Sequence, residues 1–279
     1  MNVATLCAQY TTPRLSSASF FAAVGCCGVV GLLSLTNMQG GGVSEHGSEY
    51  RTAPVVVNMQ HTVDGVPLRL DSATYRNVLG QPYTVTAFRY YVGQFTLERA
   101  DGSIYTPRGY EKTYFLVDEE QPATKLLTLP RVAMGTYTAV HFTWGIDSVL
   151  NVSGAQHGAL DPTRGMFWSW NAGYIFMKLE GTSPASSAHG RLLEYHVGGF
   201  RAPANCVRHV RIALPKPLMV GGHEAAAPKI QLRADIARLF GTPNATATTT
   251  IDFAKLPVVG DFRHAEEVAN NAATMWSSE

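Results

Sequence analysis

The chain has 279 residues, enough for one large all-β domain with a leader in front of it. Its 22 Lys and Arg residues nearly balance its 21 Asp and Glu residues, so no broad basic field favours binding to nucleic acid or to an anionic membrane surface. Three of the four cysteines precede residue 28, which leaves Cys206 alone and excludes a disulfide framework in the rest of the chain.

The N-terminal segment has the pattern of an export signal. It carries Arg14 and then no charge until Glu45, and between them the run from Phe20 to Leu35 is apolar and rich in small residues. This run is shorter than the roughly 20 residues that span a bilayer and is close to the upper length of the apolar region of a signal peptide. We therefore expect residues 1–38 to be a signal peptide or membrane leader and the Gly-rich residues 39–52 to be a flexible linker.

Such a leader predicts a periplasmic or cell-envelope protein. The sequence Ala-Val-Gly-Cys that ends at Cys26 weakly resembles a bacterial lipoprotein cleavage site, so a lipoprotein is the alternative to a free, cleaved form. In either case we expect contact with a membrane only through the leader or a lipid anchor.

After the linker, short runs with strand-like alternation follow one another, with turn-forming residues between them. These runs are Val55–Val63, Tyr83–Leu97, Tyr114–Val117, Tyr137–Trp144, Met166–Leu179, Leu192–Val197, Val207–Leu214 and Lys229–Ala234. They predict an all-β fold over residues 53–255, an antiparallel β-sandwich of the immunoglobulin-like or Greek-key type with long loops. A short helix is expected at Ile236–Phe240, and the C-terminal tail, residues 256–279, is expected to be helical or disordered from Glu266.

Two histidines lie where the strand pattern makes them candidate metal ligands. The period of two in a strand puts His61 on the same face as its apolar neighbours, so its ring nitrogens must be satisfied either by ordinary hydrogen bonds or by a metal. His196 precedes the pair Gly198-Gly199, which either frees backbone room beside the imidazole or forms a bulge with no ligand. For each of these histidines the sequence is compatible with a structural role and with a role as a metal ligand.

The segment from Gly145 to Gly181 combines a turn-rich loop with an aromatic run. In a regular strand Trp168 and Trp170 share a face with Tyr174, either as core packing or as a binding platform. In the preceding loop, the oxygens of Asp147, Asn151 and Asp161 are suited either to a hard cation or to bonds with their own backbone, the commoner use in turns.

The other candidate groups are weaker. His141 and His209 alternate with polar or small neighbours and are expected to be solvated, whereas His157 is held in reserve because its loop leads into the Trp run. Cys206 is expected to be a buried thiol rather than a metal ligand. Since the chain has no nucleophile elbow, His-Glu-x-x-His helix, Walker loop or Cys-x-x-Cys pair, we expect no enzymatic activity.

Several ordered motifs together resemble the MbnP-like family, the periplasmic copper proteins associated with methanobactin loci. The resemblance covers most of residues 55–240. Its motifs are His61 followed by Asp64-Gly65-Val66-Pro67-Leu68; Phe88-Arg89-Tyr90-Tyr91-Val92; Leu116-Val117-Asp118; Gly135-Thr136-Tyr137; Gly145-Ile146-Asp147-Ser148 with Asn151; Ser153-Gly154-Ala155-Gln156; Gly158-Ala159-Leu160-Asp161-Pro162; Gly165-Met166-Phe167-Trp168; Trp170-Asn171; Gly173-Tyr174; Lys178-Leu179-Glu180-Gly181; and Tyr195-His196-Val197-Gly198-Gly199-Phe200.

This resemblance implies an exported β-sandwich that binds one copper ion. In the studied member of the family a partner di-haem enzyme related to cytochrome c peroxidases oxidises a tryptophan to kynurenine, which helps to form the copper site. Opening the indole yields an aromatic amine beside a ketone, donors that tryptophan lacks, and imidazole suits copper. By motif position, the resemblance points to His61 and His196 as metal ligands and to Trp168 or Trp170 as the modified residue.

A metal-free alternative remains open on the residues themselves. Trp168, Trp170 and Tyr174 would then form an aromatic platform for a glycan or another ligand. If the same residues are core, the domain is a scaffold, and replacing them lowers stability rather than binding.

Overall fold

The computed structural model describes residues 51–109, 113–154, 156–169, 172–202, 204–221, 226–243, 245–246 and 248–279. The predictions for residues 1–50, which include the leader and most of the linker, lie outside this part of the chain, as does the prediction for Trp170.

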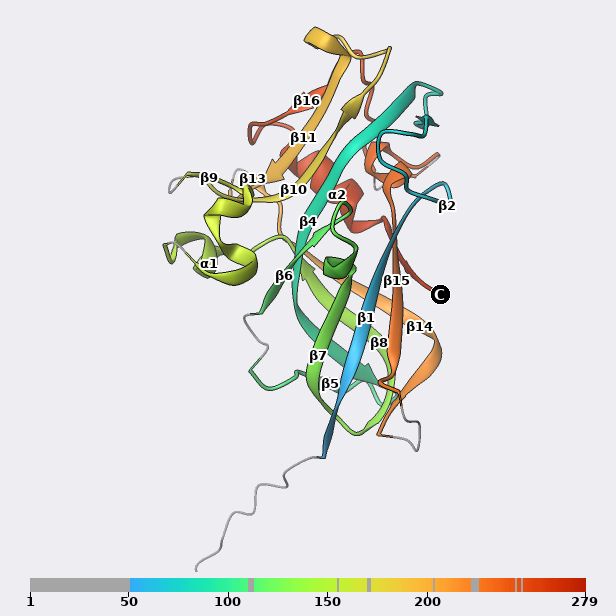
Figure 1. The fold of residues 1–279 in the computed structure, drawn as a ribbon, viewed down its shortest axis with the longest axis vertical. Helices are drawn as coiled ribbons and strands as arrows, with labels where there is room; N and C mark the ends of the chain where they lie inside the picture. Colours follow the sequence, from blue (N-terminus) through green and yellow to red (C-terminus); the bar gives the residue numbers. More distant parts are fainter. Residues whose placement is uncertain are drawn as a thin grey trace, which may run out of the picture. The chain divides into compact units, whose positions relative to one another are not determined.

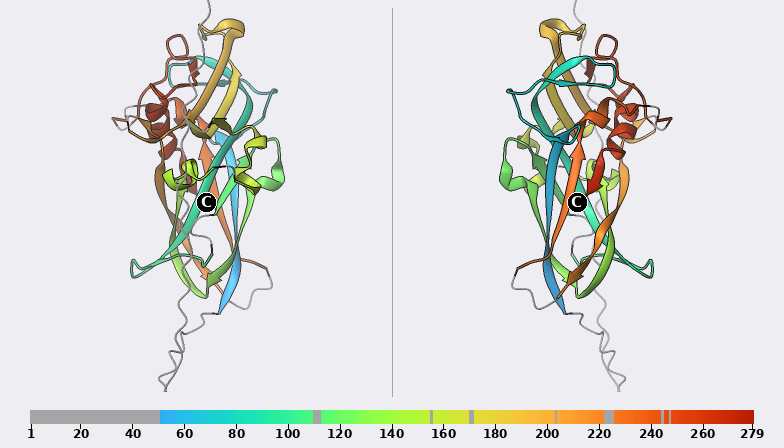
Figure 2. Two further views of the ribbon diagram at one scale, coloured as in Figure 1. Left: turned by 90° about the vertical axis from the view of Figure 1, so that its left-hand side faces the viewer. Right: turned by 90° about the vertical axis from the view of Figure 1, so that its right-hand side faces the viewer.

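The first of two main sheets is built around β1 (Thr52–Val63). The parallel strand β15 (Lys229–Asp235) pairs with one edge of β1, and the two run side by side in Figures 1 and 2. The antiparallel strands β7 (Leu126–Ala133) and β2 (Val66–Pro67) also pair with β1, and β17 (Trp276–Ser278) pairs with β15.

The second main sheet is built around the long strand β4 (Pro82–Arg99). Its N-terminal half pairs with β10 (Gly173–Thr182) and its C-terminal half with β8 (Gly135–Trp144). The sheet continues through β11 (Leu192–Gly198) and β16 (Val258–Val259) beyond β10, and through β14 (Arg208–Val220) beyond β8. Shorter strands complete it: β3 (Tyr75–Arg76), β5 (Ile104–Tyr105), β6 (Tyr114–Asp118) and β9 (Phe167–Ser169).

The remaining elements are small. A hairpin joins β12 (Phe200–Arg201) to β13 (Ala204–Asn205), and the α-helices are α1 (Ser148–Val152) and α2 (Ala265–Ala273). Turns of 3-10 helix are η1 (Pro122–Lys125), η2 (Gly158–Leu160), η3 (Pro162–Arg164), η4 (His189–Arg191) and η5 (Ile236–Phe240).

The core lies between the two sheets. Alternate residues of β1, among them Val55, Val57 and Met59, are buried, as the strand period requires. Tyr90 of β4 packs edge-on against Trp276 of β17 with ring centroids 5.5 Å apart, so aromatic side chains join one sheet to the other. The prediction of an all-β sandwich is confirmed, with β1–β15 and β11–β16 as parallel pairs within it.

The predicted single strand Met166–Leu179 is wrong. The chain reverses after Ser169 and forms the antiparallel pair β9 and β10, with Tyr174 opposite Phe167. Gly173 makes this reversal possible because its φ of +78° lies in the left-handed region that glycine adopts without strain.

Two segments of the chain were not recognised from the sequence as parts of the core. Strand β7 contains Pro130, which cannot donate a ladder hydrogen bond, and its pairing with β1 shifts register between Ala53 and Val55. The predicted tail, residues 256–279, carries α2 and β17, and both pack into the core. Ala265, Val268, Ala269 and Ala272 are buried on one face of α2, at the spacing of an amphipathic helix.

Candidate functional site

His61 lies inside the sandwich, on the buried face of β1 where the strand pattern placed it. Only 5% of the residue is exposed. Its imidazole packs edge-on against Phe88 and Tyr90 of β4, with ring centroids 5.0 and 5.5 Å away. A polar ring in this setting needs a partner for each nitrogen.

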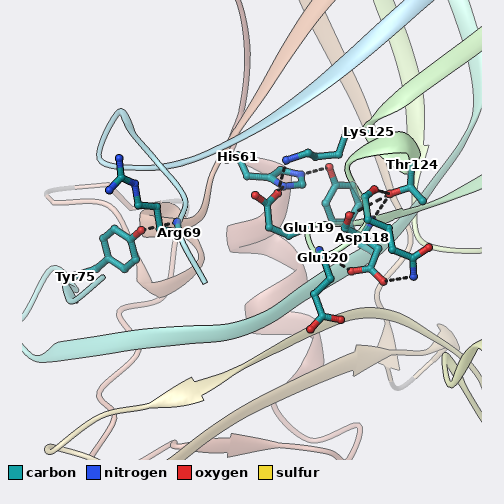
Figure 3. A network of polar contacts seen from close by, with 10 residues as sticks. His61, Arg69, Tyr75, Asp118, Glu119, Glu120, Thr124 and Lys125 are labelled. Carbon is teal, nitrogen blue, oxygen red and sulfur yellow. Dashed lines mark hydrogen bonds and ion pairs between the residues drawn. The ribbon is translucent and has the colours of Figure 1, made fainter. Parts of the chain in front are cut away.

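Both ring nitrogens of His61 have protein partners. Nδ1 lies 2.5 Å from a carboxylate oxygen of Glu119, which Lys125 also contacts at 2.9 Å, and Figure 3 shows these three side chains together. Nε2 lies 2.8 Å from the hydroxyl of Tyr90. His61 therefore joins a buried phenol to a carboxylate near the surface.

The pKa values of this group decide the direction of its hydrogen bonds. Burial lowers the pKa of His61, against the attraction of Glu119, and burial raises the pKa of Tyr90 well above its usual value. Burial also tends to raise the pKa of Glu119, but hydrogen bonds from His61 and Lys125 outweigh it and lower that pKa. The ionised Glu119 accepts the Nδ1 proton, and the free Nε2 accepts the hydroxyl proton of Tyr90.

His196 lies on the outward-facing side of β11. Its Nε2 is 2.8 Å from Glu180 of β10 and its Nδ1 is 3.3 Å from Glu194 of its own strand. The imidazole side chain is 14% exposed and both carboxylate side chains are 40% exposed. A carboxylate thus faces each edge of this ring at the surface.

The structure does not bring His61 and His196 together. Phe88, Leu179 and Tyr195 form one row across β4, β10 and β11 that is buried on the inner face, where His61 packs. The next row is Arg89, Lys178 and His196, which faces outward. The two imidazoles lie on opposite faces of the sheet, and β11 is two strand spacings, about 10 Å, from β4.

Trp168 packs against Gly198 of β11, two residues after His196. A Cβ built on Gly198 would stand 2.7 Å from Cζ3 of the Trp168 indole, so that ring occupies the space over this glycine. Gly198 is two residues after His196 on the same strand and shares its face. The room that the Gly pair was expected to free is taken up by an indole.

The loop that carries Trp168 is held by its own polar residues (α1 to β9 in Figure 1). Asp147 caps α1 by accepting the backbone N–H of Leu150 at 3.0 Å, and Asp161 accepts that of Thr163 at 2.9 Å. The Asn151 amide donates to the carbonyl of Ile146 at 2.7 Å. In this loop the Asp and Asn side chains therefore bond to nearby backbone groups, which is their commoner use in turns.

Tyr174 is fully buried and donates to the carbonyl of Leu160 at 2.7 Å, so it belongs to the core and not to an open platform. Beside Trp168, whose ring meets that of Phe262 at 5.8 Å, lies a cavity of about 300 Å³ lined by Phe200, Arg201 and Phe262. The aromatic surface near the indole therefore comes from Phe200 of β12 and from Phe262 rather than from Tyr174.

Within the described ranges, no three His, Cys, Asp or Glu side chains are grouped so that they could hold a metal ion. Cys206 is buried, and burial raises the pKa of its thiol to about 12. Of the helices in the described part of the chain, none has the length and hydropathy of a membrane-spanning helix.

Sequence reasoning missed the partners Tyr90 and Glu119. The signal for them was available, because a histidine on an apolar strand face must find hydrogen-bond partners. Both residues lie in or next to resemblance motifs, but nothing local shows that β4 and the end of β6 meet β1.

Comparison with known proteins identifies the family of this chain. The sequence model of the MbnP family matches residues 52–260. Among solved structures, the chain is similar to MbnP from Methylosinus trichosporium, with 18% sequence identity, a TM-score of 0.47 and coverage of 70% of this chain and 80% of that chain. No curated protein matches the chain.

Proposed function

Because the chain belongs to the MbnP family, whose sequence model matches residues 52–260, we propose that it is an exported copper-binding protein that serves copper acquisition or handling in the periplasm or cell envelope. The copper ion is its cargo. The proposal assigns no catalytic activity to this chain.

The observation that carries the proposal is the position of the Trp168 indole over Gly198, on the face of β11 that bears His196. The imidazole nitrogen of His196 is a donor that Cu²⁺ accepts, but the His, Cys, Asp and Glu side chains of the described residues form no complete metal-binding group with it. An unmodified indole adds no donor for copper. We propose that one copper ion binds on this face once Trp168 has been oxidised to kynurenine.

The modification supplies the missing donors at the right place. The C2–C3 bond of the indole breaks as two oxygen atoms enter at those carbons, and hydrolysis then releases C2 as formate. The product keeps an aromatic amine and a ketone, a nitrogen and oxygen pair on the side chain that packs against Gly198. The oxidant is hydrogen peroxide, of which two molecules are reduced to water for each indole opened, and a partner di-haem enzyme related to cytochrome c peroxidases catalyses the step at the half-buried Trp168.

His61 has a different part in this proposal. His61 is buried between the sheets against Phe88 and Tyr90, and the second sheet separates it from Trp168. For His61 to be a ligand of the same ion, the two imidazoles would have to come to one face. We therefore assign His61 to the stability of the sandwich and His196 to copper.

Single variants of the protein purified from its native host test this assignment. Metal analysis should give one copper per chain for the wild type and for His61→Ala, and none for His196→Ala or Trp168→Phe. Peptide mass spectrometry should show the exchange of one carbon for one oxygen at Trp168. Loss of copper in His61→Ala with retention in His196→Ala would move the site to His61. Full copper binding by the His61→Ala/His196→Ala variant would reject both residues as ligands.

A metal-free binding surface is the second candidate function. The cavity of about 300 Å³ at Phe200, Arg201 and Phe262 lies beside Trp168, and Phe262 is 43% exposed. An aromatic surface with one cation suits a glycan or another small ligand. This function predicts ligand binding that is lost in Phe262→Ala and is unaffected by metal chelators.

A further inference from the structure

A second pair of histidines shares a cavity on the outer face of the second sheet, away from β11. His141 of β8 and His209 of β14 line a cavity of about 360 Å³ together with Gln94 and Thr143. In the antiparallel register His141 is opposite Arg211 and His209 is opposite Thr143, so the two imidazoles are diagonal neighbours on one face. The backbones of diagonal neighbours on adjacent strands are roughly 7–8 Å apart, a distance that long side chains can span.

The hydrogen bonds around His209 determine which of its nitrogens carries the proton. The Gln94 amide donates to the carboxylate of Asp147 at 3.2 Å, which orients its oxygen toward Thr143. The Thr143 hydroxyl donates to that oxygen at 2.7 Å, so its own oxygen accepts from Nδ1 of His209 at 3.1 Å. Nδ1 therefore carries a proton, and Nε2 is the nitrogen left for a ligand.

The same reasoning holds for His141. Its Nε2 lies 2.7 Å from Glu98, and Arg211 binds both oxygens of this carboxylate at 2.8 Å. Hydrogen bonds from Arg211 and then from His141 lower the pKa of Glu98 to about 2, so this carboxylate is an acceptor. Nε2 therefore carries a proton, and Nδ1 is the nitrogen left for a ligand.

Metal-binding histidines share this arrangement. Such a ring donates its second N–H to a carboxylate or another acceptor, which fixes the tautomer and raises the basicity of the coordinating nitrogen. His141 and His209 both have such an acceptor, and among the residues that the structure describes no side chain bonds to Nδ1 of His141 or Nε2 of His209.

Gln94, at the start of the chain of hydrogen bonds to His209, has a strained backbone. Its φ is +51°, and the β4–β8 pairing shifts register between Gly93 and Thr96 around it. A side chain other than glycine in the left-handed region costs of order 1 kcal/mol or more, and such strain gathers at functional sites. The bulge turns the Gln94 amide toward both Asp147 and Thr143.

We propose that His141 and His209 bind one first-row transition metal ion that favours imidazole, Cu²⁺ or Zn²⁺, through Nδ1 and Nε2 respectively. The described residues offer no third side-chain ligand in a common cluster, so water completes the coordination shell. An open shell of this kind suits an ion that is exchanged with another carrier. The site does not depend on Trp168 or His196 and stands independently of the proposed copper site.

A Zn²⁺ titration tests this site in protein that already carries His196→Ala, so that the proposed copper site is absent. Calorimetry should give one equivalent of Zn²⁺. His141→Ala or His209→Ala should abolish this binding. Thr143→Val and Glu98→Gln should lower the affinity for Zn²⁺ by about 10- to 100-fold, because each removes a hydrogen-bond partner that fixes the tautomer of one histidine and leaves both histidines in place. His264→Ala, at a partly exposed histidine next to Glu267, is the matched control and should bind like the parent.

A footprint on the wild-type protein makes the test independent of these variants. Diethyl pyrocarbonate acylates free imidazole nitrogens, and peptide mass spectrometry locates the products. Zn²⁺ should protect His141 and His209 together and leave His264 reactive. Unchanged Zn²⁺ binding in a His141→Ala/His209→Ala variant, or equal reactivity of both histidines with and without Zn²⁺, would overturn the proposal whether or not copper binds at His196.

Discussion

Removal of the His61 imidazole probes the buried hydrogen-bond chain directly. In His61→Ala the Tyr90 hydroxyl, which is fully buried and bonds to Nε2 at 2.8 Å, loses its partner. An unsatisfied buried hydroxyl costs about 1–3 kcal/mol. The lost packing against Phe88 and the broken contact with Glu119 bring the expected loss to about 3–5 kcal/mol, the range for a buried pair that loses one member.

Urea unfolding of the wild type, His61→Ala, Tyr90→Phe and the double variant measures this loss and its origin. Once the imidazole is gone, the Tyr90 hydroxyl has no partner, so removing it should cost about 1–2 kcal/mol less than in the wild type. The matched control is Tyr83→Phe on the same strand. Its hydroxyl is buried without a partner among the described residues, so its removal should be neutral or stabilising.

Two results would refute this reasoning. One is a decrease of less than about 1 kcal/mol in the free energy of unfolding of His61→Ala, because removal of a buried imidazole with two hydrogen-bond partners should cost more than that. The other is an equal effect of Tyr90→Phe in both backgrounds, since additive costs mean that the two side chains do not interact.

Three further outcomes follow from single contacts. Gly198→Ala should destabilise the domain by about 2 kcal/mol, because its Cβ would stand 2.6 Å from the Tyr174 carbonyl oxygen and 2.7 Å from the Trp168 ring; Gly260→Ala, with nothing within 4 Å, is the control, and equal unfolding midpoints would contradict the close packing. Asp147→Ala should cost about 1–2 kcal/mol through loss of the α1 cap, measured by urea unfolding, and a neutral effect would show that the cap is not needed. Burial lowers the pKa of His61 in the folded state below its ordinary value of 6.5. The stabilisation of the folded state by the His61 ring should therefore be complete above pH 6.5 and should fall as the pH drops below that value. In that range the free energy of unfolding should change less with pH in His61→Gln than in the wild type, and equal slopes would argue against a neutral buried ring.

Much of the fold was predictable because strand patterns are local. The strands around His61, Phe88 and His196 appear close to their expected bounds. The failures lie where a local signal misleads: Pro130 hides β7, and aromatic residues on both sides of Gly173 resemble one strand instead of two. The C-terminal helix and strand were missed as core because their partners are distant in sequence.

For the candidate site, the residues were predictable but their grouping was not. The burial of His61 follows from the strand period, and the Gly pair after His196 marks the place where another side chain comes close to the strand. That Tyr90 and Glu119 satisfy His61, and that Trp168 accompanies His196, depends on contacts between separate strands.

The sequence by itself determined the kind of domain and which side chains of each strand share a face, because alternation repeats every two residues whatever the strand pairs with. Only the tertiary structure decided which face of β11 turns inward, and so separated His196 from His61. It likewise joined His141 and His209 in one cavity, although each alone resembles an ordinary solvated residue. Strand order and register arise from the packing of the whole core, and no short segment contains that information.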